Sequence, residues 1–360
     1  MSRFKYYIKW QARSIHPLIL VVISVAVIFA LHNVTFWTIW ADSFKGAEIR
    51  GIIFAVALLL LCCGLVSIFA MKRILQPFIA FLFILSSVTS YYMDQLGVII
   101  DREMIQNVVT TTLMEGKHLV TRSFLIWVGV SGVVPSILVF YFKIDHPKFF
   151  YSVLQNIAFL VLCILGTVLL VATDIKGNSS VLRLRIDLKS SFQPLAPITE
   201  SVLYLAMITR SATLEFQKIG SDATLISNFK KQEKPILTVV VVGETARSQS
   251  FSLGNYSRPT NPKLENEDIV YYDNVSSCGT STAVSLPCMF SKFERSNYSY
   301  EKGTSQENVL DVIQRAGYHV EWIDNNTGDK GLAARAKYTQ VTYALSLIHI
   351  SEPTRLLSIS

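Results

Sequence analysis

The sequence predicts an α-helical membrane domain followed by a domain of alternating α-helices and β-strands. Hydrophobic residues make up 51% of the 360 residues and charged residues 16%, and the mean hydropathy is +0.40. Soluble proteins carry about 25% charged residues, and the deficit here is concentrated in the first half. The second half instead alternates short β-branched runs with helical patterns and polar turns, as α/β domains do.

Five apolar runs in the first half are each close to the ~20 residues that an α-helix needs to cross a bilayer. They cover residues 17–36, 51–70, 75–93, 124–142 and 152–172. The first run lacks the small-residue cleavage site of a signal peptide, and further runs follow it. We therefore expect a five-span membrane domain over residues 1–172.

The orientation follows from the basic residues of the connections, because Lys and Arg concentrate on the cytoplasmic side. These residues are Arg3, Lys5, Lys9 and Arg13 before the first span, Lys72 and Arg73 after the second, and Lys143 and Lys148 after the fourth. With the N-terminus in the cytoplasm, five crossings place everything after residue 172 outside. In a Gram-negative cell, that side is the periplasm. The net charge of +7 is modest and lies largely in these connections, so nucleic acid is not an expected partner.

The outer loop at about residues 94–121 carries Asn107, Thr111 and Glu115 at intervals of four residues. This spacing places the three side chains on one face of a helix. A polar stripe beside a membrane suits a lipid head group, but the spacing alone is more typical of a solvated helix face.

Residues 173–234 form a more polar segment, which we interpret as a bridge with one or more helices along the membrane. Residues 200–216 have an amphipathic pattern, and Pro194 and Pro197 are expected to break regular structure before it. The basic residues of the bridge are more typical of a solvated face than of a lipid-binding surface.

The α/β domain begins at residue 235 with a β-branched run, which predicts a buried parallel strand that ends near Glu244. Sites in open α/β sheets form at the carboxyl ends of strands, so Glu244 is a candidate metal-binding carboxylate. A helix is expected after Ala246, and its amino end would attract an anion. Further strands are predicted at residues 269–275 and 318–324, with a helix at 306–315 between them.

A hydroxyl-rich loop between Cys278 and Cys288 is the main candidate for the reacting group. Thr282 is the candidate nucleophile, although threonine reacts only when a base or a metal lowers its pKa. Three other hydroxyls compete with it on chemistry alone: Thr280, Ser281 and Ser285.

The cysteines fall into two groups. Cys62, Cys63 and Cys163 lie in apolar runs and are expected to be buried thiols. Cys278 and Cys288 lie outside those runs, and two cysteines in an exported domain suggest one disulfide in an oxidising compartment. The alternative is a pair of unlinked buried thiols.

Two segments carry a resemblance to a known family: Gly243-Glu244-Thr245-Ala246-Arg247, and the loop at residues 277–291, which reads SCGTSTAVSLPCMFS. They resemble the corresponding segments of the membrane-bound lipid A phosphoethanolamine transferases. These are zinc enzymes of the alkaline phosphatase and sulfatase superfamily, and some confer resistance to polymyxin (colistin). The resemblance extends over about residues 1–343. It implies an α/β/α sulfatase-like catalytic domain, of which residues 235–345 form the N-terminal half.

The resemblance also implies roles for individual residues. Glu244 and Thr282 would be zinc ligands, and Thr282 would be the threonine that becomes phosphorylated. Cys278 and Cys288 would form a disulfide. The remaining matches concern the donor lipid: Asn107, Thr111 and Glu115 for its ethanolamine-phosphate head group, and Asn326 and Lys330 for its phosphate region. Without the resemblance, Asn326 and Lys330 belong to an ordinary polar turn.

The implied reaction is a two-step transfer of phosphoethanolamine from phosphatidylethanolamine, through Thr282, to a phosphate of lipid A. Masking that anion would weaken the binding of cationic peptides. Two alternatives stay open: a transferase that modifies core sugars of lipopolysaccharide, and an inactive membrane remnant that at most binds lipid. A lipoteichoic-acid-type synthase matches the donor stripe and the cysteine-bracketed loop less well. The protein is expected to be a monomer in contact with membrane lipids.

The zinc site is incomplete in this sequence. Zinc usually takes four ligands, and the family supplies the others from an Asp-His pair and a further histidine farther along the chain. The one Asp-His pair here, Asp145-His146, lies in an inner loop. The resemblance stops after Tyr343, and residues 346–360 look foreign to the fold. We expect a fragment that carries the complete membrane domain and about the first half of the catalytic domain.

Overall fold

The computed structural model describes residues 14–110, 116–117, 119–225, 236–243, 246–279, 281–324 and 328–341. The chain divides into two compact units. The first unit consists of Met1–Ile105 and Leu113–Tyr204, and the second of Gln106–Thr112 and Leu205–Ser360. Each unit contains its own cluster of buried apolar side chains.

Four helices of the first unit are long and apolar enough to cross a membrane, and they match four of the five predicted spans. Three of them are continuous: α3 (Glu48–Ser67), α4 (Leu75–Leu96) and α9 (Phe149–Ala172). The fourth is composite and consists of α7 (Arg122–Trp127), the π-helix η1 (Val128–Val133) and α8 (Val134–Tyr141).

The first predicted span is broken rather than continuous. α1 (Pro17–Leu31) and α2 (Val34–Ser43) meet at an angle of 73°, so five spans are reached only if this pair counts as one. Asn33 occupies the break. Its Nδ2 donates a hydrogen bond to the Ile28 carbonyl, and its Oδ1 accepts the Gln193 N–H at 2.7 Å. The side chain thus bonds backbone groups near the break, which allows a helix to end inside an apolar run.

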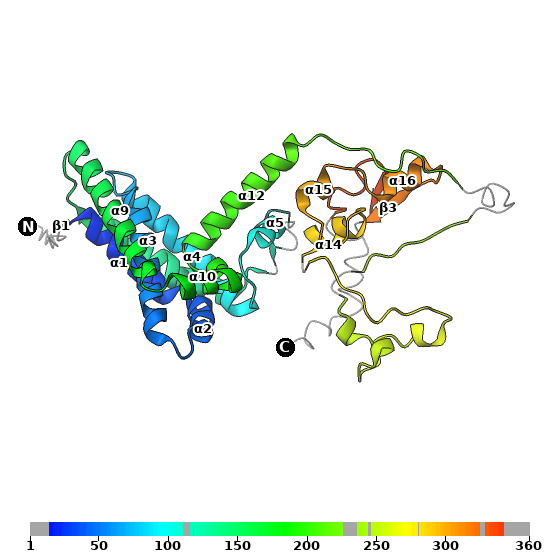
Figure 1. Ribbon diagram of the computed structural model, residues 1–360, viewed down its shortest axis with the longest axis horizontal. Helices are drawn as coiled ribbons and strands as arrows, with labels where there is room; N and C mark the ends of the chain where they lie inside the picture. Colours follow the sequence, from blue (N-terminus) through cyan, green and yellow to red (C-terminus); the bar gives the residue numbers. More distant parts are fainter. Residues whose placement is uncertain are drawn as a thin grey trace, which may run out of the picture. The chain divides into compact units, whose positions relative to one another are not determined.

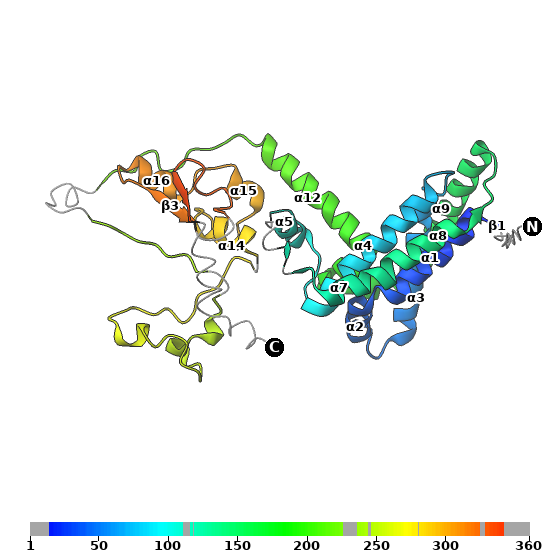
Figure 2. The ribbon, with the colours of Figure 1, turned by 180° about the vertical axis from the view of Figure 1, so that it is seen from behind.

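Small residues and buried hydroxyls hold these helices together. α3 and α9 lie side by side (Figure 1), and a Cβ built on Gly64 of α3 would stand only 2.8 Å from the Cys163 Cβ of α9. α4 runs beside α8 (Figure 2), where the Ser136 hydroxyl donates a hydrogen bond to the Ala80 carbonyl at 3.1 Å. Close packing and interhelical hydrogen bonds are the forces that associate helices in a membrane, because lipid tails are as apolar as the side chains.

Shorter elements complete the first unit and lead into the second. α10 (Ile175–Leu184), α11 (Ile186–Ser191) and α12 (Leu195–Thr213) follow the last span. The predicted helix at 200–216 thus begins earlier, at Leu195. Pro197 lies in the first turn of α12, where a helix tolerates proline, so only Pro194 stands at a break. A short parallel pair, β1 (Ser14–Ile15) and β2 (Lys143–Ile144), joins the segment before α1 to the one after α8.

The second unit contains a parallel pair of strands with helices beside it (Figure 1). β3 (Glu321–Asp324) and β4 (Lys337–Gln340) are in register with Glu321 opposite Lys337. The helices of this unit include α14 (Thr282–Met289), α15 (Tyr300–Thr304) and α16 (Val309–Arg315). The part of α5 (Arg102–Thr110) from Gln106 onward also belongs to this unit. The sequence of α16 followed by β3 agrees with the predicted helix and third strand, and β4 was not predicted.

Two predicted strands and one predicted helix do not form. The described residues 236–243 and 269–275 contain no strand, and the side chains of Leu237 and Val241 are 86% and 85% exposed rather than buried. After Ala246 the chain makes two 3₁₀ turns, η2 (Ser248–Ser250) and η3 (Ser252–Gly254), with a third, η4 (Leu264–Asn266), farther on. β-branched residues favour a strand, but a strand is stable only when neighbouring strands bond its backbone, and these segments have no such neighbour among the described residues.

Candidate active site

Thr282 is the first residue of α14 and is half-buried. Ser281 before it has an extended backbone and serves as the N-cap, a position that serine favours, and its carbonyl accepts the Ser285 N–H at 2.9 Å. The first N–H groups of a helix have no partner within the helix and project outward from its amino end. The helix dipole makes this end positive. The Thr282 hydroxyl is therefore placed where the negative charge of a phosphoryl group is stabilised.

A disulfide between Cys278 and Cys288 clamps this helix, as predicted. Its Cα atoms are 6.2 Å apart. Cys278 precedes the hydroxyl-rich loop and Cys288 lies in the last turn of α14, so the link fixes both ends of the segment that presents Thr282.

A small apolar cluster packs α14 against the loop that follows β3. Leu286 of α14 and its C-cap residue Phe290 form this cluster with Leu332. The Phe290 ring meets the Trp322 ring of β3 edge to face at 5.7 Å. Lys330 lies two residues before Leu332. The cluster therefore joins the helix that carries Thr282 to the loop that carries Lys330.

The backbone of Lys330 is left-handed, with φ +52°. Gly328 and Gly331 on either side also have positive φ, and the Asp329 carboxylate accepts the N–H groups of Gly331 and Ala333. A left-handed conformation costs a residue with a Cβ roughly 1–2 kcal/mol, so this turn holds Lys330 in an uncommon position.

An ion pair between the half-exposed Arg335 and the buried Asp311 supports the same loop from the other side. Arg335 donates hydrogen bonds from Nε and Nη2 to the two Asp311 oxygens, each at 2.6 Å. Asp311 also accepts the Asn308 N–H at 2.8 Å in a capping box at the start of α16, and Asn308 Nδ2 donates to the Leu332 carbonyl. Burial raises the pKa of Asp311, but the hydrogen bonds from Arg335 and Asn308 outweigh burial and leave the pKa below its usual range.

Two further carboxylates of the second unit have specific partners. Glu307 pairs with Arg315, whose hydrogen bond lowers the pKa of Glu307. Asp324, at the end of β3, accepts the Tyr338 hydroxyl at 2.7 Å, and this bond raises the pKa of Tyr338 to about 12. These contacts fix β3, β4 and α16 around the loop of Lys330.

The predicted site residues fall into two groups. Thr282 and Lys330 lie on elements that the apolar cluster joins, and Asn107 lies in the part of α5 that belongs to the same second unit. The remaining predicted site residues, Glu244, Thr111, Glu115 and Asn326, lie outside the described residues.

Sequence reasoning missed the amino end of α14 as the anion-favouring helix start and assigned that property to the segment after Ala246. It also missed the link between Asp311 and Arg335, although the Asn-x-x-Asp spacing at residues 308–311 is a readable capping signal.

A zinc site is not assembled from the part of the chain that the structure describes. Within those residues no three His, Cys, Asp or Glu side chains converge on a point that could hold a metal ion. Of the two predicted ligands, Thr282 is described and Glu244 is not. Four-coordinate zinc needs more donors than these two residues supply.

Two family models and a solved structure show which class of proteins this chain resembles. A family model described as "Phosphoethanolamine transferase EptA/EptB" matches residues 57–208, and one described as "Sulfatase" matches residues 237–348. A solved structure of the integral membrane protein lipooligosaccharide phosphoethanolamine transferase A (EptA) from Neisseria meningitidis has a TM-score of 0.81 over 95% of this chain and 67% of its own. At 24% identity this likeness shows the fold: a helical membrane domain followed by a sulfatase-like domain.

Curated relatives then give the family. Phosphoethanolamine transferase EptA of Escherichia coli K12 is 39% identical over 273 residues, which is 76% of this chain and 50% of the relative. Phosphatidylethanolamine transferase Mcr-1 of Escherichia coli is 32% identical over 337 residues, 90% of this chain and 61% of the relative. The chain belongs to the phosphoethanolamine transferase family of these proteins, and it spans about half to three fifths of their length.

Proposed function

We propose that this protein transfers phosphoethanolamine from phosphatidylethanolamine to a phosphate of lipid A, with a covalent intermediate on Thr282. The observation that carries the proposal is the position of Thr282, at the amino end of α14 and inside the loop closed by Cys278 and Cys288. Membership in the family of EptA and Mcr-1 supports the reaction class.

The proposed reaction has two displacements at phosphorus. In the first, the Thr282 hydroxyl oxygen attacks the donor phosphorus, the bond to the diacylglycerol oxygen breaks, and the threonine proton ends on diacylglycerol. In the second, a phosphate oxygen of lipid A attacks the same phosphorus and Thr282 leaves with a proton. The amino end of α14 would stabilise the charge on the phosphoryl oxygens, and Lys330 would add a positive charge nearby.

The donor is proposed to bind through the residues that the family resemblance indicates. Asn107, Thr111 and Glu115 would hold the head group, with the Glu115 carboxylate attracting the ammonium, and Asn326 would join Lys330 at the phosphate. Asn107 and Lys330 belong to the same compact unit as Thr282, which supports a shared site.

Zinc is proposed as the cofactor on the family resemblance, with Glu244 and Thr282 among its ligands. The proposal is tested by the metal content of the purified protein. Replacing Glu244 with Gln should lower bound zinc relative to the parent, because an amide is a weaker ligand than a carboxylate. Equal zinc content in both proteins would remove Glu244 from the ligand set.

The second unit is proposed to face the periplasm from a Gram-negative inner membrane, with the N-terminus in the cytoplasm and the protein a monomer. The basic connections at Lys72, Arg73, Lys143 and Lys148 support this orientation. The Cys278–Cys288 disulfide supports it independently, because such bonds persist in oxidising compartments.

Lipid A is favoured over core sugars as the acceptor. Membership in the family of EptA and Mcr-1 supports this choice. The test is expression of the protein, and of its Thr282→Ala variant, in a Gram-negative host, followed by mass spectrometry of lipid A and core separately. Phosphoethanolamine on lipid A from the parent alone is the expected result, and lower polymyxin binding should follow. Addition to the core would favour the alternative acceptor, and no addition would favour an inactive remnant.

A further inference from the structure

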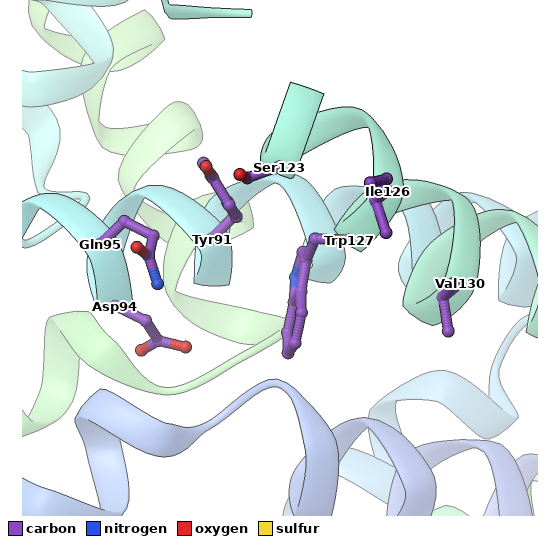
Figure 3. A pocket seen from close by; sticks show the side chains of 7 residues that line it. All are labelled: Tyr91, Asp94, Gln95, Ser123, Ile126, Trp127 and Val130. Carbon is purple, nitrogen blue, oxygen red and sulfur yellow. The ribbon is translucent and has the colours of Figure 1, made fainter. Parts of the chain in front are cut away.

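A cavity of about 450 Å³ lies between the end of α4 and the first part of the composite span, which is formed by α7 and η1 (Figure 3). α4 contributes Tyr91, Asp94 and Gln95, and α7 and η1 contribute Ile126, Trp127 and Val130. All of these residues belong to the first unit. The volume is within the range of small-molecule sites, and it suits a lipid head group rather than a whole lipid.

Asp94 gives the cavity its charge. One of its oxygens, Oδ1, accepts hydrogen bonds from the Thr35 N–H at 3.1 Å and the Thr35 hydroxyl at 2.6 Å, so the carboxylate is held in place. Among the described residues that line the cavity, Asp94 is the one with a charged side chain. Asp94 also has no salt bridge to Lys, Arg or His within the described ranges. The cavity therefore favours a cation and disfavours an anionic head group.

Aromatic rings provide the second feature. The Trp127 indole Nε1 donates to the Ser87 carbonyl at 3.2 Å, and the Tyr91 hydroxyl is hydrogen-bonded to the Thr121 hydroxyl at 3.0 Å. These bonds orient both rings at the cavity, where Figure 3 shows Trp127 beside the space next to Asp94. Ring faces attract ammonium groups. Tyr91 and Trp127 line the same cavity as the Asp94 carboxylate, and this combination of side chains favours an amine.

The apolar side of the cavity is formed by side chains on the exposed outer surface of the helices. Ile126 and Val130 line it and are 57% and 66% exposed, on a span apolar enough to lie in a membrane. Trp127 is followed directly by the π-helix η1, and π-helical turns are frequent at functional sites. A ligand with an ammonium at Asp94 and a hydrocarbon chain along Ile126 and Val130 satisfies both sides of the cavity.

We propose that this cavity captures phosphatidylethanolamine in the helical unit, with the ammonium against Asp94 and Trp127 and an acyl chain along Ile126 and Val130. The inference rests on the proposed function, which requires this lipid as the donor. It adds a binding site for the donor that is built from the first unit alone.

The test measures lipid binding to the full chain, in a Thr282→Ala background so that transfer cannot consume the lipid. A fluorescent phosphatidylethanolamine is titrated into the detergent-solubilised protein and compared with the matching phosphatidylglycerol. Asp94→Asn removes the charge but keeps the oxygen that accepts from Thr35, and Val130→Phe fills the open side at an exposed position. Asp145→Asn, an exposed carboxylate in another loop, is the matched control.

The parent should bind phosphatidylethanolamine more tightly than phosphatidylglycerol. Asp94→Asn and Val130→Phe should each weaken the binding of phosphatidylethanolamine about tenfold, which is the order expected when one ammonium contact is lost or the space for the acyl chain is filled. Asp145→Asn should leave binding unchanged. Equal binding of the two lipids by the parent would overturn the proposal, as would unchanged binding in both cavity variants.

A second measurement separates this proposal from the proposed function. The adduct on Thr282 is followed with Thr282 restored. Lipid binding that depends on Asp94 without any adduct would contradict the transfer reaction and leave the capture site standing. Adduct formation in Asp94→Asn at the parent rate, at limiting lipid, would contradict the capture site and leave the transfer reaction standing.

Discussion

The two units of this protein are stabilised by different kinds of contact. The first unit has a large cluster of buried apolar side chains from α1, α3 and α4, with helices that approach closely at positions such as Gly64 and Ser136. The described part of the second unit has a small apolar cluster built on Leu286, Phe290 and Leu332, and it depends in addition on a disulfide and on paired carboxylates. Individual polar links should therefore matter more in the second unit, and close packing more in the first.

The largest expected effect is the loss of the disulfide. Replacing Cys278 and Cys288 with Ser should destabilise the second unit by about 3 kcal/mol, because the link closes a short loop and restricts the unfolded chain. Hydrogen exchange read by mass spectrometry should show faster exchange in α14 and unchanged exchange in α3 and α9. Cys163→Ala, in the first unit, is the control and should leave α14 unaffected. Unchanged exchange in α14 of the double variant would contradict the comparison.

The next effect concerns the ion pair behind the Lys330 loop. Arg335→Ala should destabilise the second unit by about 2 kcal/mol, because it leaves the buried Asp311 carboxylate without its partner; the figure is reduced for the exposed part of Arg335. Lys337→Ala removes the exposed partner of Glu321 and should change stability by about 0.5 kcal/mol or less. Denaturant-dependent hydrogen exchange of α16 measures both. If the two variants behaved alike, the buried pair would not be a main support of the loop.

A smaller effect is expected at a close contact of the first unit. Gly64→Ala should destabilise the packing of α3 on α9 by about 1 kcal/mol, because the added methyl group meets Cys163 at 2.8 Å. Gly129→Ala is the matched control, since its added Cβ meets no atom within 4 Å beyond its chain neighbours and the adjoining backbone of its own helix. Thermal unfolding in detergent compares the two variants. Equal melting temperatures would mean that α3 and α9 can separate slightly without loss of stability.

The smallest effect is the response to mild acid. Asp311 and Glu307 have folded-state pKa values below the unfolded values of 3.8 and 4.5, so their contribution is complete above those values and is lost as the pH falls through the lower folded values. The second unit should therefore lose protection against hydrogen exchange only below about pH 4. In Arg335→Ala the Asp311 part of this loss should begin at higher pH. If the parent protein lost this protection already near neutral pH, groups other than Asp311 and Glu307 would be responsible for the loss.

The sequence predicted the first unit better than the second for a physical reason. A spanning helix bonds its own backbone, so an apolar run of sufficient length predicts α3, α4 and α9 directly. The break after α1 was missed because the hydrogen bond that stabilises it joins Asn33 to Gln193, far along the chain. The run at 236–243 was predicted as a buried strand, but a strand depends on neighbours that local sequence does not specify.

The site shows the same division. The loop of Thr282 and its disulfide could be predicted, because the hydroxyls and cysteines are close in sequence and carry the family resemblance. The pairing of Asp311 with Arg335 and the left-handed backbone of Lys330 could not, because both depend on how the loop packs against α14 and α16. The roles of Glu244, Thr111, Glu115 and Asn326 remain predictions.

The central claim is the covalent intermediate, and the most direct measurement locates it. The protein, expressed from its own coding DNA in bacterial membranes, is incubated with phosphatidylethanolamine in the absence of acceptor, quenched, digested and analysed by tandem mass spectrometry of the peptide that contains residues 277–291. The account predicts one phosphoethanolamine group on Thr282 of the parent protein. The Thr282→Ala variant should carry no such group. The Thr282→Ser variant should lack it only if serine cannot replace threonine as the nucleophile. An adduct on Thr280, Ser281 or Ser285 instead of Thr282 would contradict the account. So would a parallel reaction with lipid A present that yields modified lipid A while this peptide carries no adduct in the reaction without acceptor.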